Sequence, residues 1–182
     1  MNPRTPLVCL LCALGLMLLA ACGGSGPGTG TTTTSAGESA STTASAVDMS
    51  AGELGDAIGA TWSEAMQKLV ALLESKPEAV AIQGQVEQLK EEYIGKLVQL
   101  GRQREALGVS DKAKAGVRTV AALDAAGDEA WYVGYKSLYE HYSEGELGFA
   151  NLLASFNILT QYAEFELLKQ QAPEEATRLG IE

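Results

Sequence analysis

From Val47 onward, apolar residues recur every three or four positions, and no stretch alternates in the manner of a β-strand. This period places apolar side chains along one side of an α-helix. The clearest stripe has a spacing close to the ~3.5 residues of helices packed in a bundle. Its members are Ile82, Val86, Leu89, Tyr93, Leu97, Leu100 and Leu107. The chain is therefore predicted to be all-α.

Polar motifs predict where these helices begin. Ser50 and Glu53 match a capping box, in which the two side chains bond free N–H groups at a helix start. The segments Ser75–Glu78 and Ser143–Glu146 repeat the pattern, and Pro77 falls in the expected first turn of the second helix. Helices are thus expected over about 50–74, 75–107, 110–142 and 143–172, with a short tail helix starting at Pro173.

The ends and inner faces of the later helices follow from the same pattern. Gly108 is predicted to end the second helix, and Gly127 to kink or split the third, with Asp128 capping its second half. The face expected to point inward on the third helix carries Val117, Val120, Trp131, Tyr135, Leu138 and Tyr142. On the fourth it carries Leu147, Ala150, Leu153, Phe156, Thr160, Ala163 and Leu167.

Very short turns join these helices, so consecutive helices must run in opposite directions. The predicted fold is an antiparallel, up-down-up-down four-helix bundle with a short C-terminal helix. The start of the first helix and the turn near Gly108 lie at one end, here the proximal end. The turns near Ser75 and Ser143 lie at the other, the distal end.

The N-terminal region is of a different kind. Leu7–Ala21 is uncharged and rich in leucine, and it is shorter than the ~20 residues that a membrane-spanning helix needs. It follows a weakly basic start and ends in Leu19-Ala20-Ala21-Cys22. This arrangement resembles the signal of bacterial lipoproteins. The resemblance implies that residues 1–21 are removed and that Cys22 carries lipid. The alternative is ordinary secretion with cleavage after an alanine, which leaves Cys22 a free thiol.

Residues 22–47 are almost wholly Gly, Ser, Thr and Ala, a composition typical of a flexible linker. Residues 48–182 then form the helical domain. Cys9 and Cys12 belong to the expected leader, so Cys22 is the one cysteine of the mature chain, and the domain must fold without an internal disulfide. The resemblance implies a lipid-anchored protein on the extracytoplasmic side of a bacterial membrane, either the cell membrane or the outer membrane.

Charge and missing motifs argue against several classes of function. The net charge of −10 at pH 7 disfavours binding to nucleic acid. The sequence lacks a Cys-x-x-Cys-His haem motif and a Gly-x-Ser-x-Gly elbow, and its glycines follow no strand that could hold a phosphate loop. We therefore expect a protein that is not an enzyme and that uses no cofactor.

The distal segment Tyr135–Glu146 holds the single histidine of the chain, His141. Because the linker leaves this end free, we expect it to bind a partner through Tyr132, Tyr135, Tyr139, His141 and Tyr142. With its glutamates, His141 could instead hold a divalent cation, but Leu138 stands where a di-iron bundle has glutamate, so no metal site is predicted. The third interpretation is a solvated loop covering the core.

A basic patch surrounds the turn near Gly108. Its members are Arg102, Arg104, Lys112, Lys114 and Arg118. At the proximal end these residues could face anionic lipid headgroups. Alternatively they pair with acidic residues expected at the same end, namely Asp48, Glu53, Asp56, Glu174 and Glu175.

Two further groups admit two interpretations each. Asp124 and Asp128 could act as paired carboxylates or simply flank the break at Gly127. Aromatic residues at helical spacing could line a ligand pocket or form plain core. These are Trp62, Tyr93, Trp131, Tyr132, Tyr135, Phe149 and Phe156. The expected function is a non-catalytic binding or scaffold module for another envelope macromolecule, and the alternative is a carrier of a small molecule or metal ion.

Overall fold

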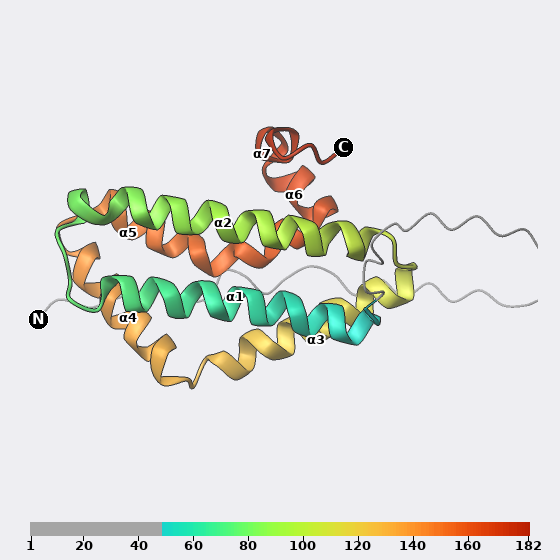
Figure 1. Ribbon diagram of the computed structural model, residues 1–182, viewed down its shortest axis with the longest axis horizontal. Helices are drawn as coiled ribbons and strands as arrows, with labels where there is room; N and C mark the ends of the chain where they lie inside the picture. Colours follow the sequence, from blue (N-terminus) through green and yellow to red (C-terminus); the bar gives the residue numbers. More distant parts are fainter. Residues whose placement is uncertain (1–48) are drawn as a thin grey trace, which may run out of the picture. The chain divides into compact units, whose positions relative to one another are not determined.

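A computed structural model describes residues 49–182, and every regular element within that span is a helix (Figure 1). The two longest, α1 (Ala51–Leu73) and α2 (Ala79–Glu105), lie side by side in opposite directions, joined by the turn 74–78. The all-helical prediction is confirmed for this part of the chain. None of its helices is both long and apolar enough to cross a bilayer.

The remaining elements pack around this pair. They are α3 (Val109–Ala126), α4 (Ala130–Ser143), α5 (Leu147–Ala154), the 3₁₀ helix η1 (Ser155–Ala163), α6 (Phe165–Gln171) and α7 (Pro173–Arg178). α3 lies along the first half of α1, α4 contacts α1 and α5, and η1 lies along α2. The α2 stripe contributes Ile82, Val86, Tyr93 and Leu97 to the core, where they are buried.

The first predicted capping box is present, and the other two predictions are wrong. The backbone N–H of Glu53 donates to the Ser50 hydroxyl (3.4 Å), and that of Ser50 donates to the Glu53 carboxylate (2.8 Å). At the other two sites, Glu78 and Glu146 precede the helices and make no side-chain cap bond, and Pro77 lies before α2. The α1–α2 turn extends to Glu78, so Ser75 lies too early in the chain to cap α2. Ser143 still belongs to α4, where its hydroxyl donates to the Glu140 carbonyl (2.8 Å).

Gly127 splits the third predicted helix, as expected, into α3 and α4. The residue that precedes α4 is Glu129, so the prediction that Asp128 caps it is wrong. Gly108 does not end α2, which stops at Glu105. Instead Gly108 precedes α3 with extended backbone (φ −66°, ψ 160°).

The predicted inner face of α3 is wrong. Val117 and Val120 are 68% and 57% exposed, whereas Ala115, Thr119 and Ala126 are buried. The cause lies on α1. A Cβ atom added to Gly55 would stand 2.3 Å from the Ala115 carbonyl oxygen, so the two backbones approach too closely to leave room for a valine between them.

The fourth predicted helix is interrupted. α5 passes into η1, whose 3₁₀ geometry ends at Glu164 (φ −119°, ψ 78°) before α6 begins. The Ser155 hydroxyl and the Asn157 amide donate to the carbonyls of Leu152 and Ala154. Such side-chain bonds compete with regular helix geometry. Ala150, Leu153, Phe156 and Ala163 are buried as predicted, but Leu147 is 65% exposed.

Candidate interaction surfaces

The distal end is fixed by contacts between distant parts of the chain. The Tyr142 hydroxyl at the end of α4 donates to the Pro77 carbonyl in the turn 74–78 (2.7 Å). The Tyr142 ring also meets Phe149 of α5 edge to face, with centroids 4.8 Å apart. One buried tyrosine therefore joins the α1–α2 turn, α4 and α5.

The tyrosines proposed to bind a partner are more covered than His141. Tyr135 and Tyr142 are buried core residues, Tyr132 and Tyr139 are half-buried, and His141 is exposed. The Tyr135 hydroxyl donates to the Leu153 carbonyl (3.2 Å) and accepts from the Asn157 amide (2.6 Å). Burial raises the pKa of Tyr135 to about 12. Of this set, only His141 is exposed.

The distal end also exposes apolar residues that the sequence analysis missed. Val80, in the first turn of α2, is 90% exposed, and Leu147 opens α5. The sequence could have predicted the exposure of Val80, because this residue lies off the apolar stripe that contains Ile82 and Val86. Leu147 was wrongly predicted to face inward, because it lies three residues before the buried Ala150 and so matches the spacing of the inner face.

Exposed carboxylates occupy the turns before α2 and α5 and the last turn of α4. They are Glu74, Glu78, Glu140, Glu144 and Glu146. None forms an ion pair with another residue of the span 49–182. Glu74 and Glu144 occupy the C-terminal caps of α1 and α4, where the helix dipole disfavours negative charge. These carboxylates therefore weaken the helices that carry them. In the same span, no three His, Cys, Asp or Glu side chains are placed to share a metal ion.

The basic residues near the proximal end are largely paired within the domain. Arg118 makes a two-bonded contact from its guanidinium to the Asp56 carboxylate (2.9 and 2.7 Å). Lys114 pairs with Asp111 (2.8 Å), Lys112 with Glu105, and Arg104 approaches Glu164 at 3.8 Å.

One pairing agrees with the sequence-based alternative, because Asp56 is among the partners expected there. Asp48 lies outside the described residues. Arg102 is exposed and forms no ion pair within the described span. The Arg118–Asp56 and Lys114–Asp111 pairs are exposed, and such pairs contribute little to stability, at most about 1 kcal/mol each. Four of the five patch residues thus present a charge already partly neutralised by a neighbour.

The aromatic residues pack on one another. The Trp62 indole N–H donates to the Phe156 carbonyl (3.0 Å), and the ring meets Trp131 edge to face at 5.8 Å. Tyr132 stacks on Tyr135 with centroids 5.7 Å apart. The aromatic side chains therefore act as core, and neither of the two hollows described next lies among them.

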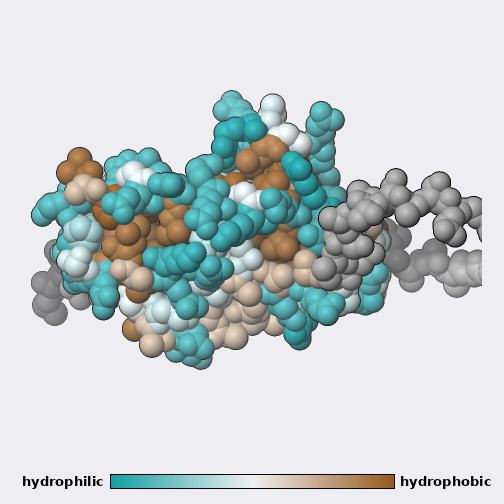
Figure 2. Space-filling view, in the orientation of Figure 1, coloured by the Kyte–Doolittle hydropathy of each residue, from teal (hydrophilic) through white to brown (hydrophobic). Residues whose placement is uncertain are grey.

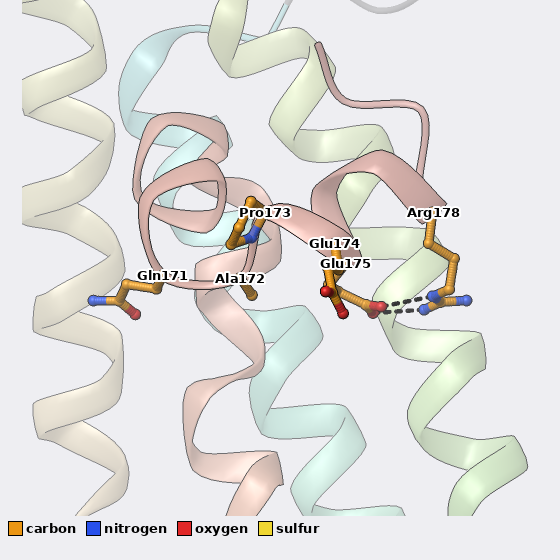
Figure 3. A pocket seen from close by; sticks show the side chains of 6 residues that line it. All are labelled: Gln171, Ala172, Pro173, Glu174, Glu175 and Arg178. Carbon is orange, nitrogen blue, oxygen red and sulfur yellow. Dashed lines mark hydrogen bonds and ion pairs between the residues drawn. The ribbon is translucent and has the colours of Figure 1, made fainter.

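Both hollows are on the surface near the C-terminal helices. The larger, of about 600 Å³, is lined by Gln171, Ala172, Pro173, Glu174, Glu175 and Arg178 (Figure 3). Arg178 bonds to Glu175 there (2.6 Å) and also reaches Glu91 of α2 (3.1 Å). The second, of about 350 Å³, involves Arg102, Phe165 and Lys169. In Figure 2 apolar surface also gathers at the base of these helices. Both hollows are shallow depressions beside exposed charged side chains.

Asp124 and Asp128, considered above as paired carboxylates, are both exposed near the break between α3 and α4. Their positions agree with residues that flank Gly127.

No known protein family, curated protein or solved structure matches this chain. A function for this chain therefore has to be inferred from the arrangement of its own residues.

Proposed function

We propose that this chain is a lipoprotein anchored through Cys22 on the extracytoplasmic side of a bacterial membrane. Its helical domain would serve as a non-catalytic binding or scaffold module for another envelope macromolecule. The anchor is supported by the sequence Leu19-Ala20-Ala21-Cys22 after an apolar run, which lies outside the described residues. Acyl chains contribute roughly 0.8 kcal/mol per buried CH₂, so a multiply acylated Cys22 would hold the protein on the bilayer.

The proposed contact surface is the distal end, comprising His141, Tyr139, Val80, Leu147 and the surrounding glutamates. The observation that carries this proposal is the placement of Glu74 and Glu144 at helix C-termini, where they destabilise the helix and form no ion pair within the domain. Residues that break a local rule for stability are expected at functional sites. The start of α1, which follows the linker, lies at the opposite end of the helix pair.

We further propose that the domain is a distorted up-down-up-down four-helix bundle. In this interpretation the members are α1, α2, the pair α3–α4, and the pair α5–η1. The distortion arises at the third member, because α3 packs mainly on α1, which lies diagonally opposite in a regular bundle, and only slightly on α2. The basic patch would add weak attraction to anionic lipid, mainly through Arg102.

Crosslinking in intact cells tests the binding proposal. A photo-reactive amino acid placed at His141 of the full chain should give a covalent adduct with one envelope partner. Adding Val80→Ser and Leu147→Ser should reduce that adduct about tenfold, the equivalent of about 1.4 kcal/mol of binding free energy. These residues are exposed, so the domain should remain folded.

The matched control uses residues of the same helix away from the tip. Lys136→Ala and Ser137→Ala, both exposed on α4, should leave the adduct unchanged. A photo-reactive group at Asp124 should not capture the same partner. Equal adducts from His141 and Asp124, or an adduct that is insensitive to the Val80 and Leu147 changes, would refute a distal binding surface.

A further inference from the structure

The outer face of α3 carries exposed, β-branched apolar residues. Val109, Val117 and Val120 are all exposed, whereas the residues buried against α1 are Ala115, Thr119 and Ala126. β-Branched residues on an exposed helix face lower helix propensity. The exposed valines therefore weaken α3 unless something covers them.

The valines cannot turn inward, because α3 is fixed in its rotation. The Thr119 hydroxyl bonds to the Gly55 carbonyl (3.2 Å), and a Cβ atom on Gly59 would lie 2.4 Å from the Ala122 Cβ atom. Arg118 bonds Asp56 beside this contact. Glycine on α1 and alanine on α3 thus determine which side of α3 faces out.

The exposed stripe is complementary to itself. Ala113, Val117, Val120 and Asp124 follow one another at the three- and four-residue spacing of a helix face, and all are exposed. Because this spacing is symmetric about the middle of the stripe, two antiparallel copies of α3 would place Val117 against Val120 of the second copy. Ala113 would then lie opposite Asp124. Because the alanine side chain is small, it would leave room for the two helices to approach each other.

The charges fit the same antiparallel arrangement. The first half of α3 carries Lys112 and Lys114, which pair with Glu105 and Asp111 of the same chain, whereas Arg118 at its centre is bonded to Asp56 of α1. The second half and the turn after it carry Asp124, Asp128 and Glu129, none of which forms an ion pair in the span 49–182. An antiparallel pair would bring the basic half of each helix beside the acidic half of the other, and it would also oppose the two helix dipoles.

We propose that α3 is the interface of a homodimer, in which two copies of this chain pack antiparallel through Val117 and Val120. A contact made by one helix falls at the small end of specific interfaces, below about 1,200 Å² in total. The dimer should therefore dissociate on dilution. It leaves the distal surfaces free and does not depend on the proposed binding function.

Cysteine crosslinking of the full chain tests the register. Two differently tagged variants, Val117→Cys and Val120→Cys, are co-expressed, and the whole cells are oxidised before lysis. The mixed pair should form a disulfide-linked dimer faster than either variant alone, because an antiparallel pair brings residue 117 next to residue 120. Val133→Cys, exposed on α4, is the matched control, and the wild-type chain gives the background from Cys22.

A second measurement, of the mass of the assembled protein, tests the dimer even if the introduced cysteines react poorly. Val117→Glu with Val120→Glu should reduce the mass of the full chain in detergent from dimer to monomer, as measured by native mass spectrometry at high concentration. Circular dichroism should remain unchanged, because both residues are exposed. A wild-type mass equal to the monomer, faster crosslinking of like variants, or a disulfide only to a different protein would overturn the proposal.

Discussion

At the scale of single residues, two glycines determine how α1 and α3 pack. A Cβ atom on Gly55 would lie 2.3 Å from the Ala115 carbonyl oxygen, and one on Gly59 would lie 2.4 Å from the Ala122 Cβ atom. Backbone cannot yield to such a contact without moving the helix. Glycine normally costs about 0.5–1 kcal/mol within a helix, and here the close packing that it permits offsets that cost.

We predict opposite effects for two Gly→Ala substitutions within helices. Gly55→Ala should lower the free energy of unfolding by about 1–3 kcal/mol, because the added methyl overpacks the α1–α3 contact. Gly84→Ala, on α2 with no atom within 4 Å of the added Cβ, should raise it by up to about 1 kcal/mol. Urea denaturation measures both, and an equal effect of the two changes would contradict the close contact.

Buried tyrosines make the fold sensitive to alkali. Burial raises the pKa of Tyr135 to about 12, and burial, with Glu175 nearby, raises that of Tyr162 to about 12. In the unfolded chain a tyrosine has a pKa of about 10. The folded state therefore holds these protons more tightly. The stability they contribute is complete below about pH 10 and is lost as the pH rises through 12.

We predict that the urea midpoint is level between pH 7 and 9 and falls between pH 10 and 12. Tyr135→Phe should reduce this alkaline loss, because phenylalanine has no proton to release. At neutral pH the same variant should be slightly less stable, since it loses the bonds to Leu153 and Asn157. An alkaline loss of the same size in Tyr135→Phe would show that Tyr135 does not titrate in the folded protein.

At the scale of elements, the sequence was sufficient where local chemistry decides. Ser50 and Glu53 locate the start of α1, the spacing of Ile82 to Leu97 identifies the inner face of α2, and Gly127 marks the break between α3 and α4. The face of α3 depends instead on Gly55 and its neighbours, some 60 residues earlier in the chain. The periodicity of α3 alone does not contain that information.

We predict that the inner and outer faces of α3 respond differently to changes in size. Ala115→Val should destabilise the fold by about 1–3 kcal/mol, since Ala115 is fully buried against α1. Val117→Ala, measured in dilute protein, should leave stability unchanged or raise it by a few tenths of a kcal/mol, because alanine favours helix. Thermal denaturation distinguishes them, and a large loss in Val117→Ala would mean that the valine faces the core.

The candidate site was predictable only in outline. Sequence identified the distal segment and His141, but which tyrosines remain open depends on what packs over them. Tyr142 is covered because Pro77 and Phe149 come from other elements. The exposed apolar residues Val80 and Leu147 lie at helix starts, where the expected capping boxes did not form.

At the scale of the whole molecule, the unpaired acidic residues of the distal end and the N-terminal lipoprotein-like sequence support the same proposal, an anchored binding module. Several carboxylates on the sides of the helices pair with nearby bases, as Asp56 does with Arg118 and Glu175 with Arg178, whereas the five glutamates of the distal end form no ion pair within the described span. An anchored domain with an unpaired acidic end would present that end to partners beyond the membrane surface. Both proposals about binding and lipid contact therefore depend on acylation of Cys22.

Metabolic labelling with an alkyne fatty acid tests that claim most directly. The full chain and its Cys22→Ser variant are expressed in bacteria, and label on the purified protein is measured together with its N-terminal sequence. We predict label on the wild-type chain, which begins at Cys22, and none on the variant. An unlabelled wild-type chain, or one recovered from the cytosol with Met1 intact, would contradict the proposed anchor.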